Sequence, residues 1–142
     1  MPQESIKPAS PELFERFRFM YGVLSRGDWD TYLAVLHDDV EVHQSSDILG
    51  TRGTFRGKQG ALQAMAEIAE SFSEIDWNPQ RLYDLGEERY LMLAKPKVRG
   101  AGSGIEVETE VGHLAQLRDG KIARLDVYLG WNTALEAVGL SE

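Results

Sequence analysis

The chain has 142 residues, no cysteine and a formal net charge of -8 at pH 7. This length suits one domain spanning residues 1–142, and the lack of cysteine excludes disulfides, cysteine zinc sites and a thiol nucleophile. The acidic balance argues against nucleic acid or an anionic membrane surface as a partner. The start "MPQESIKPAS" has no apolar signal core, and no apolar run approaches the ~20 residues of a membrane span, so we predict a soluble, cytoplasmic protein.

A helix is predicted over residues 10–27. Ser10 can cap it, Pro11 suits its first position and Gly27 ends it. Apolar side chains recur along it at three- and four-residue steps and share one face: Leu13, Phe14, Phe17, Met20, Tyr21 and Leu24. By this spacing Tyr21 belongs to the core, and its hydroxyl can also face a pocket.

A second, short helix and a strand are expected next. Asp28 caps the helix in "DWDTYLAVLHDDV". Its apolar residues are expected to point inward: Trp29, Leu33 and Leu36. "VEVHQ" alternates as a strand, so Gln44 should point inward with Val40 and Val42. The Gly-rich loop "GTRGTFRGKQG" then leads into a third helix, over about residues 58–72.

The second half of the chain changes to a two-residue period, which is typical of strands. "NPQRLYDLGEERYLMLAKPKVRG" is predicted as two strands joined at Gly86, and "AGSG" as a turn. Residues 105–117 are predicted as one long strand, Asp119-Gly120 as a hairpin turn and residues 121–129 as the returning strand. "NTALEAVGLSE" closes with a short helix. Helices followed by an antiparallel meander predict an α+β fold, with helices on one face of a curved sheet.

The register of this hairpin decides what surrounds His113. A two-residue turn would place His113 opposite Asp126, where the two side chains can hydrogen-bond. A three-residue loop with Gly120 in a left-handed bulge would shift the register by one. The two-residue register turns Arg124 and Asp126 inward, at a cost of several kcal/mol for each buried unpaired charge. The hydrophobic pattern therefore favours the bulged loop, with His113 on the face of Val127 and Asp126 on the outer face.

The chain resembles the SnoaL-like branch of the nuclear transport factor 2-like superfamily. The resemblance rests on three N-terminal helices and on "GDWDTYLAVLHDDVEVH", "GTFRGKQGALQAM", "RDGKIARLDVYLG" and "ALEAVGL", and it covers about residues 10–140. It implies a single SnoaL-like domain with a cone-shaped, curved, mostly antiparallel sheet wrapped on three N-terminal helices, a cystatin-like α+β barrel around an apolar pocket. Family members include ketosteroid isomerases, polyketide cyclases, limonene-epoxide hydrolases and scytalone dehydratases.

The resemblance also implies a homodimer, because dimers that pack through the outer sheet face are frequent in this superfamily. Here Leu114, Gln116 and Tyr128 share the outer face and suit an interface better than solvent. We therefore predict a homodimer through these three residues.

Ketosteroid isomerases need a carboxylate base and an oxyanion hole of a tyrosine and a protonated aspartic acid. The resemblance places the base at Gln44, which cannot abstract a proton. It places the oxyanion aspartic acid at His113, which can donate or exchange a proton. The tyrosine falls at Met20 or, with a slip of one residue, at Tyr21.

Two other activities of the family depend on side chains that this chain lacks or has only in part. The arginine and aspartates of limonene-epoxide hydrolases fall at Ala94, Pro96 and Val127, so we reject that chemistry. The cyclases have a pocket histidine on the penultimate strand, which His113 matches. Their aspartate base falls at Val127, one residue from Asp126, so an alternative register would restore the pair.

His113 is the candidate catalytic residue, since a histidine in a wet pocket is a competent general acid or base. A core histidine bonded to a buried hydroxyl or carbonyl is the alternative. Tyr21, Gln44, Val127 and Trp131 are the candidate substrate-binding residues, and Trp131 is large enough to close a pocket mouth. No cofactor is expected, and the three histidines lack metal-ligand spacing.

Two functions follow. The first is a cofactor-independent isomerase, cyclase or dehydratase that acts on an apolar, carbonyl-bearing substrate by proton transfer. The second is a non-catalytic ligand-binding or dimeric interaction protein of the same fold.

Overall fold

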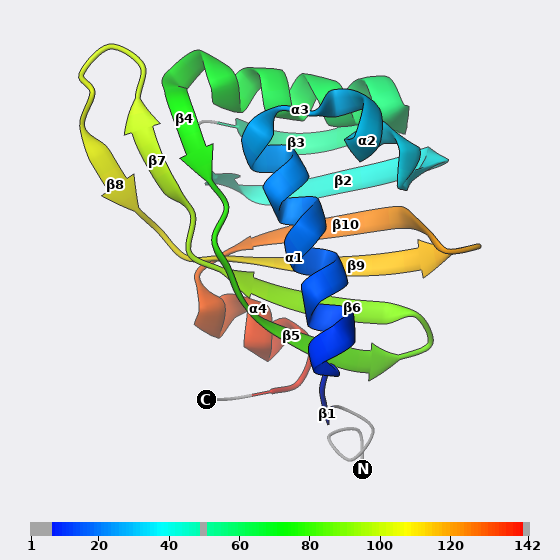
Figure 1. The fold of residues 1–142 in the computed structure, drawn as a ribbon. Coiled ribbons are helices and arrows are strands. Elements are labelled where there is room, and N and C mark those ends of the chain that lie inside the picture. Colours follow the sequence, from blue (N-terminus) through cyan, green and yellow to red (C-terminus); the bar gives the residue numbers. More distant parts are fainter. Residues whose placement is uncertain (1–6, 49–50, 141–142) are drawn as a thin grey trace.

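The computed structural model describes residues 7–48 and 51–140 (Figure 1). Its elements follow the chain in this order: β1 (Lys7–Pro8), α1 (Pro11–Arg26), α2 (Trp29–Ala34), β2 (Leu36–Ile48), β3 (Thr51–Arg56), α3 (Gly57–Ser71), β4 (Phe72–Asp76), β5 (Pro79–Gly86), β6 (Arg89–Ala94), β7 (Lys97–Gly100), β8 (Glu106–Glu108), β9 (Val111–Arg118), β10 (Lys121–Leu129) and α4 (Trp131–Ala137). Within these ranges, no helix has the length and apolar character needed to cross a membrane. The cytoplasmic location stays a prediction.

In the described residues, seven strands form one large sheet in the order β1-β5-β6-β9-β10-β2-β3, and β4, β7 and β8 form a second, smaller sheet. Paired strands are antiparallel except β10 and β2, which run parallel. Figure 1 shows α1 lying across the large sheet, with α2 and α3 at its β2–β3 end. The curved, mostly antiparallel sheet on three N-terminal helices is confirmed. In the described part of the chain its edges are β1 and β3, which do not pair, so the sheet is open and the expected barrel is wrong.

The large sheet has apolar cores on both of its faces. Successive side chains of a strand point to opposite faces. On one face, Met92 and Val127 belong to the cores that contain the side chains of α1, α2 and α3. On the other face, Leu91 and Leu93 pack with Trp131 and the rest of α4.

The predicted starts and ends of the first two helices are confirmed. The Ser10 hydroxyl accepts a hydrogen bond from the Leu13 N–H, and Gly27 ends α1 with a φ of 71°. The Asp28 carboxylate accepts from the Thr31 N–H and hydroxyl at 3.3 and 2.8 Å.

The predicted inward face of the second helix is partly wrong. Trp29 is 38 % exposed, and Tyr32 is the buried residue of α2, at 8 %. Leu36 is buried, but it begins β2, because the helix ends at Ala34. Trp29 occupies the first turn at the surface, where its ring packs edge-on against Tyr32 with centroids 6.3 Å apart.

The predicted long strand over residues 105–117 is divided in two. Among the described strands, β8 pairs only with β7 in the small sheet, whereas β9 lies inside the large sheet. Between β8 and β9, the Thr109 N–H donates to the Pro96 carbonyl, and this hydrogen bond belongs to neither sheet. As a result Ile105 and Val107, expected on the core face, are 65 % and 52 % exposed.

The hairpin that follows β9 has a two-residue turn. Arg118 pairs with Lys121, and Asp119 and Gly120 between them have φ of 55° and 76°. Positive φ at both central residues is the geometry of a type I′ turn, in which Asp-Gly is a favoured pair. The predicted three-residue loop is therefore wrong.

The predicted register is nevertheless confirmed, because a bulge between Ile122 and Arg124 shifts the pairing by one residue. Beyond the bulge, His113 pairs with Val127, while Asp126 lies on the outer face. The extra residue therefore reconciles a tight Asp-Gly turn with an inward-facing apolar strand.

Candidate functional site

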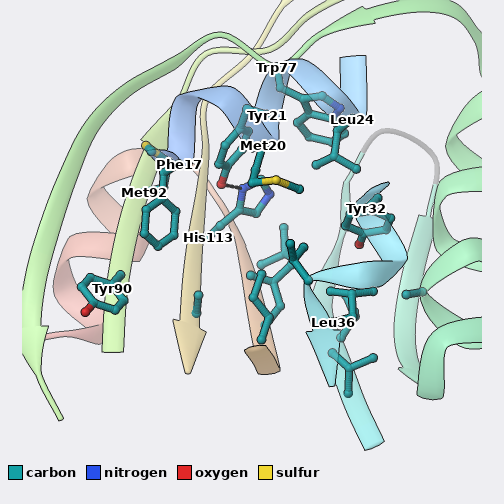
Figure 2. Close-up of a pocket in the computed structure, with 18 of the residues that line it drawn as sticks. Phe17, Met20, Tyr21, Leu24, Tyr32, Leu36, Trp77, Tyr90, Met92 and His113 are labelled. Atoms are coloured by element: carbon teal, nitrogen blue, oxygen red, sulfur yellow. Dashed lines mark hydrogen bonds between the residues drawn. The ribbon is translucent and has the colours of Figure 1, made fainter. Parts of the chain in front are cut away.

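A cavity of ≈ 650 Å³ lies between the N-terminal helices and the large sheet. Side chains of α1, α2, α3, β2, β6, β9 and β10 line it, and most of them are apolar (Figure 2). Pockets that bury small organic ligands have this size, with mainly apolar walls and a few polar groups. The polar side chains in the wall are therefore the candidates for ligand recognition.

Two of these polar side chains, Tyr21 and His113, form a buried hydrogen-bonded pair. The Tyr21 hydroxyl oxygen lies 2.6 Å from His113 Nδ1, and the two rings stack with centroids 5.6 Å apart (Figure 2). The residues are 9 % and 7 % exposed, and both line the cavity. His113 is thus a buried histidine bonded to a hydroxyl and also a wall residue of the cavity, which the sequence analysis treated as alternatives.

Neighbouring elements hold this pair in place. Tyr21 lies on the inward face of α1, and His113 on β9 pairs with Val127 on β10. Trp77, between β4 and β5, packs its ring against His113 with centroids 5.7 Å apart. The Trp77 backbone N–H donates to the Ser25 hydroxyl, which donates to the Tyr21 backbone carbonyl. Two aromatic rings therefore fix the orientation of the imidazole.

Burial sets the protonation of both groups. It lowers the pKa of His113 to about 4, because a charged imidazolium would lose its hydration inside the protein. Burial also raises the pKa of Tyr21 above its ordinary value, and the nearby Tyr32 raises it further. At neutral pH the site therefore holds a neutral imidazole beside a neutral phenol.

The direction of the hydrogen bond decides what the imidazole offers to the cavity. When the Tyr21 hydroxyl donates to Nδ1, the neutral ring carries its proton on Nε2. When Nδ1–H donates to the hydroxyl oxygen, Nε2 is an acceptor. Among the residues that the structure describes, His113 Nε2 has no hydrogen-bond partner. The pair can therefore present either a donor or an acceptor to a ligand.

Trp131 lies outside the cavity, contrary to the prediction that it contacts a ligand there. It is the first residue of α4 and packs in the core between α4 and the sheet, where its indole N–H donates to the Ala94 carbonyl at 2.8 Å. Arg81 and Lys95 lie over its ring, 5.5 and 5.1 Å from the centroid. The chain leaves β10 through Gly130, with a φ of 91°, and so carries Trp131 to the opposite face of the sheet.

Tyr32 and Trp77 lie in the cavity wall and were not among the predicted site residues. They are 8 % and 5 % exposed. Tyr32 lies four residues after the Asp28 cap, one turn into the helix, and this spacing could have identified it. Trp77 lies between two strands, where no periodicity indicates its direction.

The wall of the cavity offers little acid–base chemistry besides His113. Glu15 is the one carboxylate in the wall as far as the structure describes it, and it lies on the exposed side of α1. The described ranges also contain no group of three or more His, Cys, Asp or Glu side chains placed to hold a metal ion. The chemistry of the site therefore depends on the neutral Tyr21–His113 pair.

The residues predicted at a dimer interface lie on the outer face of the sheet. Leu114 and Tyr128 are half-buried beside the α4 core, and the Gln116 side-chain amide donates to two backbone carbonyl groups. Asp126, on the same face, accepts hydrogen bonds of 2.9 and 3.1 Å from the Arg124 guanidinium. Asp126 is therefore an ion-paired surface residue and has no contact with His113.

Residues 17–125 match the family of the SnoaL-like domain. The chain belongs to this family. A comparison with curated proteins gave no significant match. The SnoaL-like fold is also shared with solved structures that have low sequence identity to this chain.

Three of these structures cover most of the chain. TerC, co-crystallised with polyporic acid, is 20 % identical over 91 % of this chain and 98 % of its own, with a TM-score of 0.71. An NTF2-like protein from Burkholderia pseudomallei is 17 % identical over 89 % and 96 %, with a TM-score of 0.73. A candidate polyketide cyclase from Sinorhizobium meliloti is 21 % identical over 77 % and 90 %, with a TM-score of 0.61. At these identities the likeness shows the fold.

In this SnoaL-like domain, Gln44 and Val127 occupy the positions that the family resemblance assigns to carboxylate bases. They pair with each other across the parallel strands β2 and β10, and both line the cavity. They are 6 % and 5 % exposed. The structure thus places the two positions at the cavity wall and fills them with an amide and an aliphatic side chain.

Proposed function

We propose that the protein binds a small, largely apolar carbonyl compound and acts on it without a cofactor, as an isomerase, cyclase or dehydratase. One observation supports this proposal above the others. The buried Tyr21–His113 pair lies in the wall of a mainly apolar cavity, and the second imidazole nitrogen has no partner among the described residues. A carbonyl oxygen is the acceptor that fits such a donor in apolar surroundings.

In the proposed reaction, Tyr21 donates to His113 Nδ1, and Nε2–H donates to the substrate carbonyl oxygen. A neutral imidazole can polarise a carbonyl in this way, and this raises the acidity of the C–H next to the carbonyl. The hydrogen bond strengthens as negative charge develops on the oxygen, so it favours the transition state over the bound substrate.

The proton must also have an acceptor. One nitrogen cannot donate to the carbonyl and take a proton in the same step, so the ring first changes tautomer. Nδ1–H then donates to the Tyr21 oxygen, and Nε2 takes the proton from carbon. The Nε2–H bond formed in this step donates to the enolate oxygen. Because burial lowers the pKa of His113 to about 4, this imidazole is a weak base and the imidazolium is a strong acid. The proposed substrate therefore has an acidic C–H, and the imidazolium returns the proton readily to a second carbon.

A non-catalytic ligand-binding protein is the second candidate. It is favoured by the same low basicity and by Gln44 and Val127, which stand at the positions of the family's carboxylate bases. In that case the Tyr21–His113 pair would recognise a carbonyl oxygen and transfer no proton.

Deuterium exchange into β-tetralone, followed by NMR in D₂O, distinguishes the two candidates. For the enzyme, the wild type accelerates exchange, and His113→Gln loses about 10²–10⁴-fold of the acceleration. A His37→Gln variant is the matched control, because His37 lies outside the cavity wall, where its ring accepts hydrogen bonds from the Asp39 N–H and the Arg118 guanidinium. Binding of the ketone without accelerated exchange leaves the ligand-binding function, and the absence of binding contradicts both.

We also propose that the protein is a homodimer through Leu114, Gln116 and Tyr128. These side chains share the outer face of β9 and β10, where apolar and amide groups lie next to an ion pair. Sedimentation equilibrium tests the proposal directly. A monomer at micromolar concentration contradicts it.

A further inference from the structure

Tyr32 is a second buried phenol in the wall of the cavity. It lies on α2, is 8 % exposed and lines the same space as Tyr21 and His113. Figure 2 shows Tyr32 on the α2 side of the cavity and the Tyr21–His113 pair on the α1 and β9 side. A ligand between these two walls would contact polar groups at both.

The Tyr32 hydroxyl differs from the Tyr21 hydroxyl in its hydrogen bonding. Tyr21 is bonded to His113, whereas Tyr32 has no hydrogen-bond partner in the described part of the chain. The Tyr32 hydroxyl oxygen is also not fully sealed from the space around it. Since a buried tyrosine hydroxyl normally has a partner, an unpaired one that faces a cavity indicates a position for a ligand or water oxygen.

The position of Tyr32 is set before any ligand binds. The Asp28 carboxylate caps α2 through two hydrogen bonds to Thr31, and Trp29 packs edge-on against the Tyr32 ring. Burial raises the pKa of Tyr32 to about 12, so the hydroxyl keeps its proton at neutral pH and can donate it.

We propose that Tyr32 is a second ligand-binding residue, and that the ligand carries two separated acceptor oxygens, one for His113 and one for Tyr32. The chemical class is a mainly apolar dicarbonyl or hydroxycarbonyl compound. This inference rests on the proposed function, because His113 receives the first oxygen. A ligand with one oxygen leaves one buried donor without an acceptor and binds more weakly.

A pair of volume-matched probes tests this inference. Diacetylnaphthalene carries a ketone at each end, and acetylnaphthalene with an isopropyl group in place of the second acetyl group carries one. Binding of each to the wild type, His113→Gln, Tyr32→Phe and Tyr83→Phe is measured by isothermal titration calorimetry. Tyr83→Phe is the matched control, since Tyr83 is a half-buried tyrosine that packs beside the α4 core.

The wild type and Tyr83→Phe are expected to bind the diketone about 10- to 100-fold more tightly than the monoketone. Tyr32→Phe should abolish this preference and keep the affinity for the monoketone, while His113→Gln should weaken both probes. A preference that survives in Tyr32→Phe, or that is absent in the wild type, overturns the Tyr32 assignment alone. If neither probe binds the wild type, or if His113→Gln binds both probes unchanged, the proposed function fails and the assignment falls with it.

Discussion

The buried neutral state of His113 predicts a specific dependence of stability on pH. The folded pKa is about 4, whereas an unfolded histidine titrates near 6.5. Between these values the unfolded chain binds a proton that the folded protein does not, so stability falls as pH decreases from 6.5 to 4. Relative to pH 7.5, His113 should lower the free energy of unfolding at pH 4.5 by about 2–3 kcal/mol.

Urea unfolding of the wild type and His113→Gln at both pH values measures this contribution. The acidic side chains are common to both proteins, so the difference between their pH dependences isolates His113. We expect His113→Gln to be less stable than the wild type at pH 7.5, since it loses the ring contacts with Tyr21 and Trp77. On going to pH 4.5, its free energy of unfolding should fall by about 2–3 kcal/mol less than that of the wild type. Parallel pH dependences would refute the argument that burial keeps this imidazole neutral.

Two further predictions concern the elements around the site. Gly112→Ala should lower the free energy of unfolding by about 1–3 kcal/mol, because the added Cβ overlaps the Ala134 Cβ of α4. Gly102→Ala, where the new Cβ meets no atom within 4 Å, is the control, and equal urea midpoints for the two variants would contradict the packing argument. Asp28→Ala should cost about 1 kcal/mol by removing the cap of α2, and Asp28→Asn should restore most of it. Identical midpoints for the wild type and Asp28→Ala would show that the cap adds no stability.

The parts of the fold that follow from local chemistry were predictable. Ser10 and Asp28 begin helices and Gly27 ends one, because each position needs a side-chain acceptor or a left-handed backbone. The pairing of His113 with Val127 followed from the cost of turning charged side chains inward. These helix ends and this strand register depend on a few residues that are neighbours in the sequence.

The bulge in the β9–β10 hairpin could not be predicted from the local sequence. From the sequence, a two-residue Asp119-Gly120 turn and an inward-facing Val127 were expected to exclude each other. The protein has both, with a bulge between them. A bulge is an adjustment of pairing between strands and has no fixed composition. In the same way, the alternation across residues 105–117 continues through a change of sheet, because a two-residue period does not reveal the partner strand.

Four of the residues in the candidate site were predicted one by one, but the contacts between them were not. Tyr21, Gln44, Val127 and His113 all line the cavity, but they come from four different elements. Whether two of them touch depends on how α1 crosses the sheet, which spacing within α1 cannot specify. Trp131 was misplaced for the same reason, since its side of the sheet is decided by the turn at the end of β10.

The charges around the cavity limit what the site can bind and stabilise. Its interior offers neutral donors, the phenols of Tyr21 and Tyr32 and the imidazole of His113, and in the described residues no cation lies buried among them. With a net charge of -8, the protein repels anions at long range, and the interior, as far as its residues are described, has no full positive charge to compensate one. A neutral carbonyl compound meets neither obstacle. If its oxygen gains negative charge only as a proton leaves carbon, the preoriented donors stabilise that charge at the point where it forms, without requiring a charged ligand to enter.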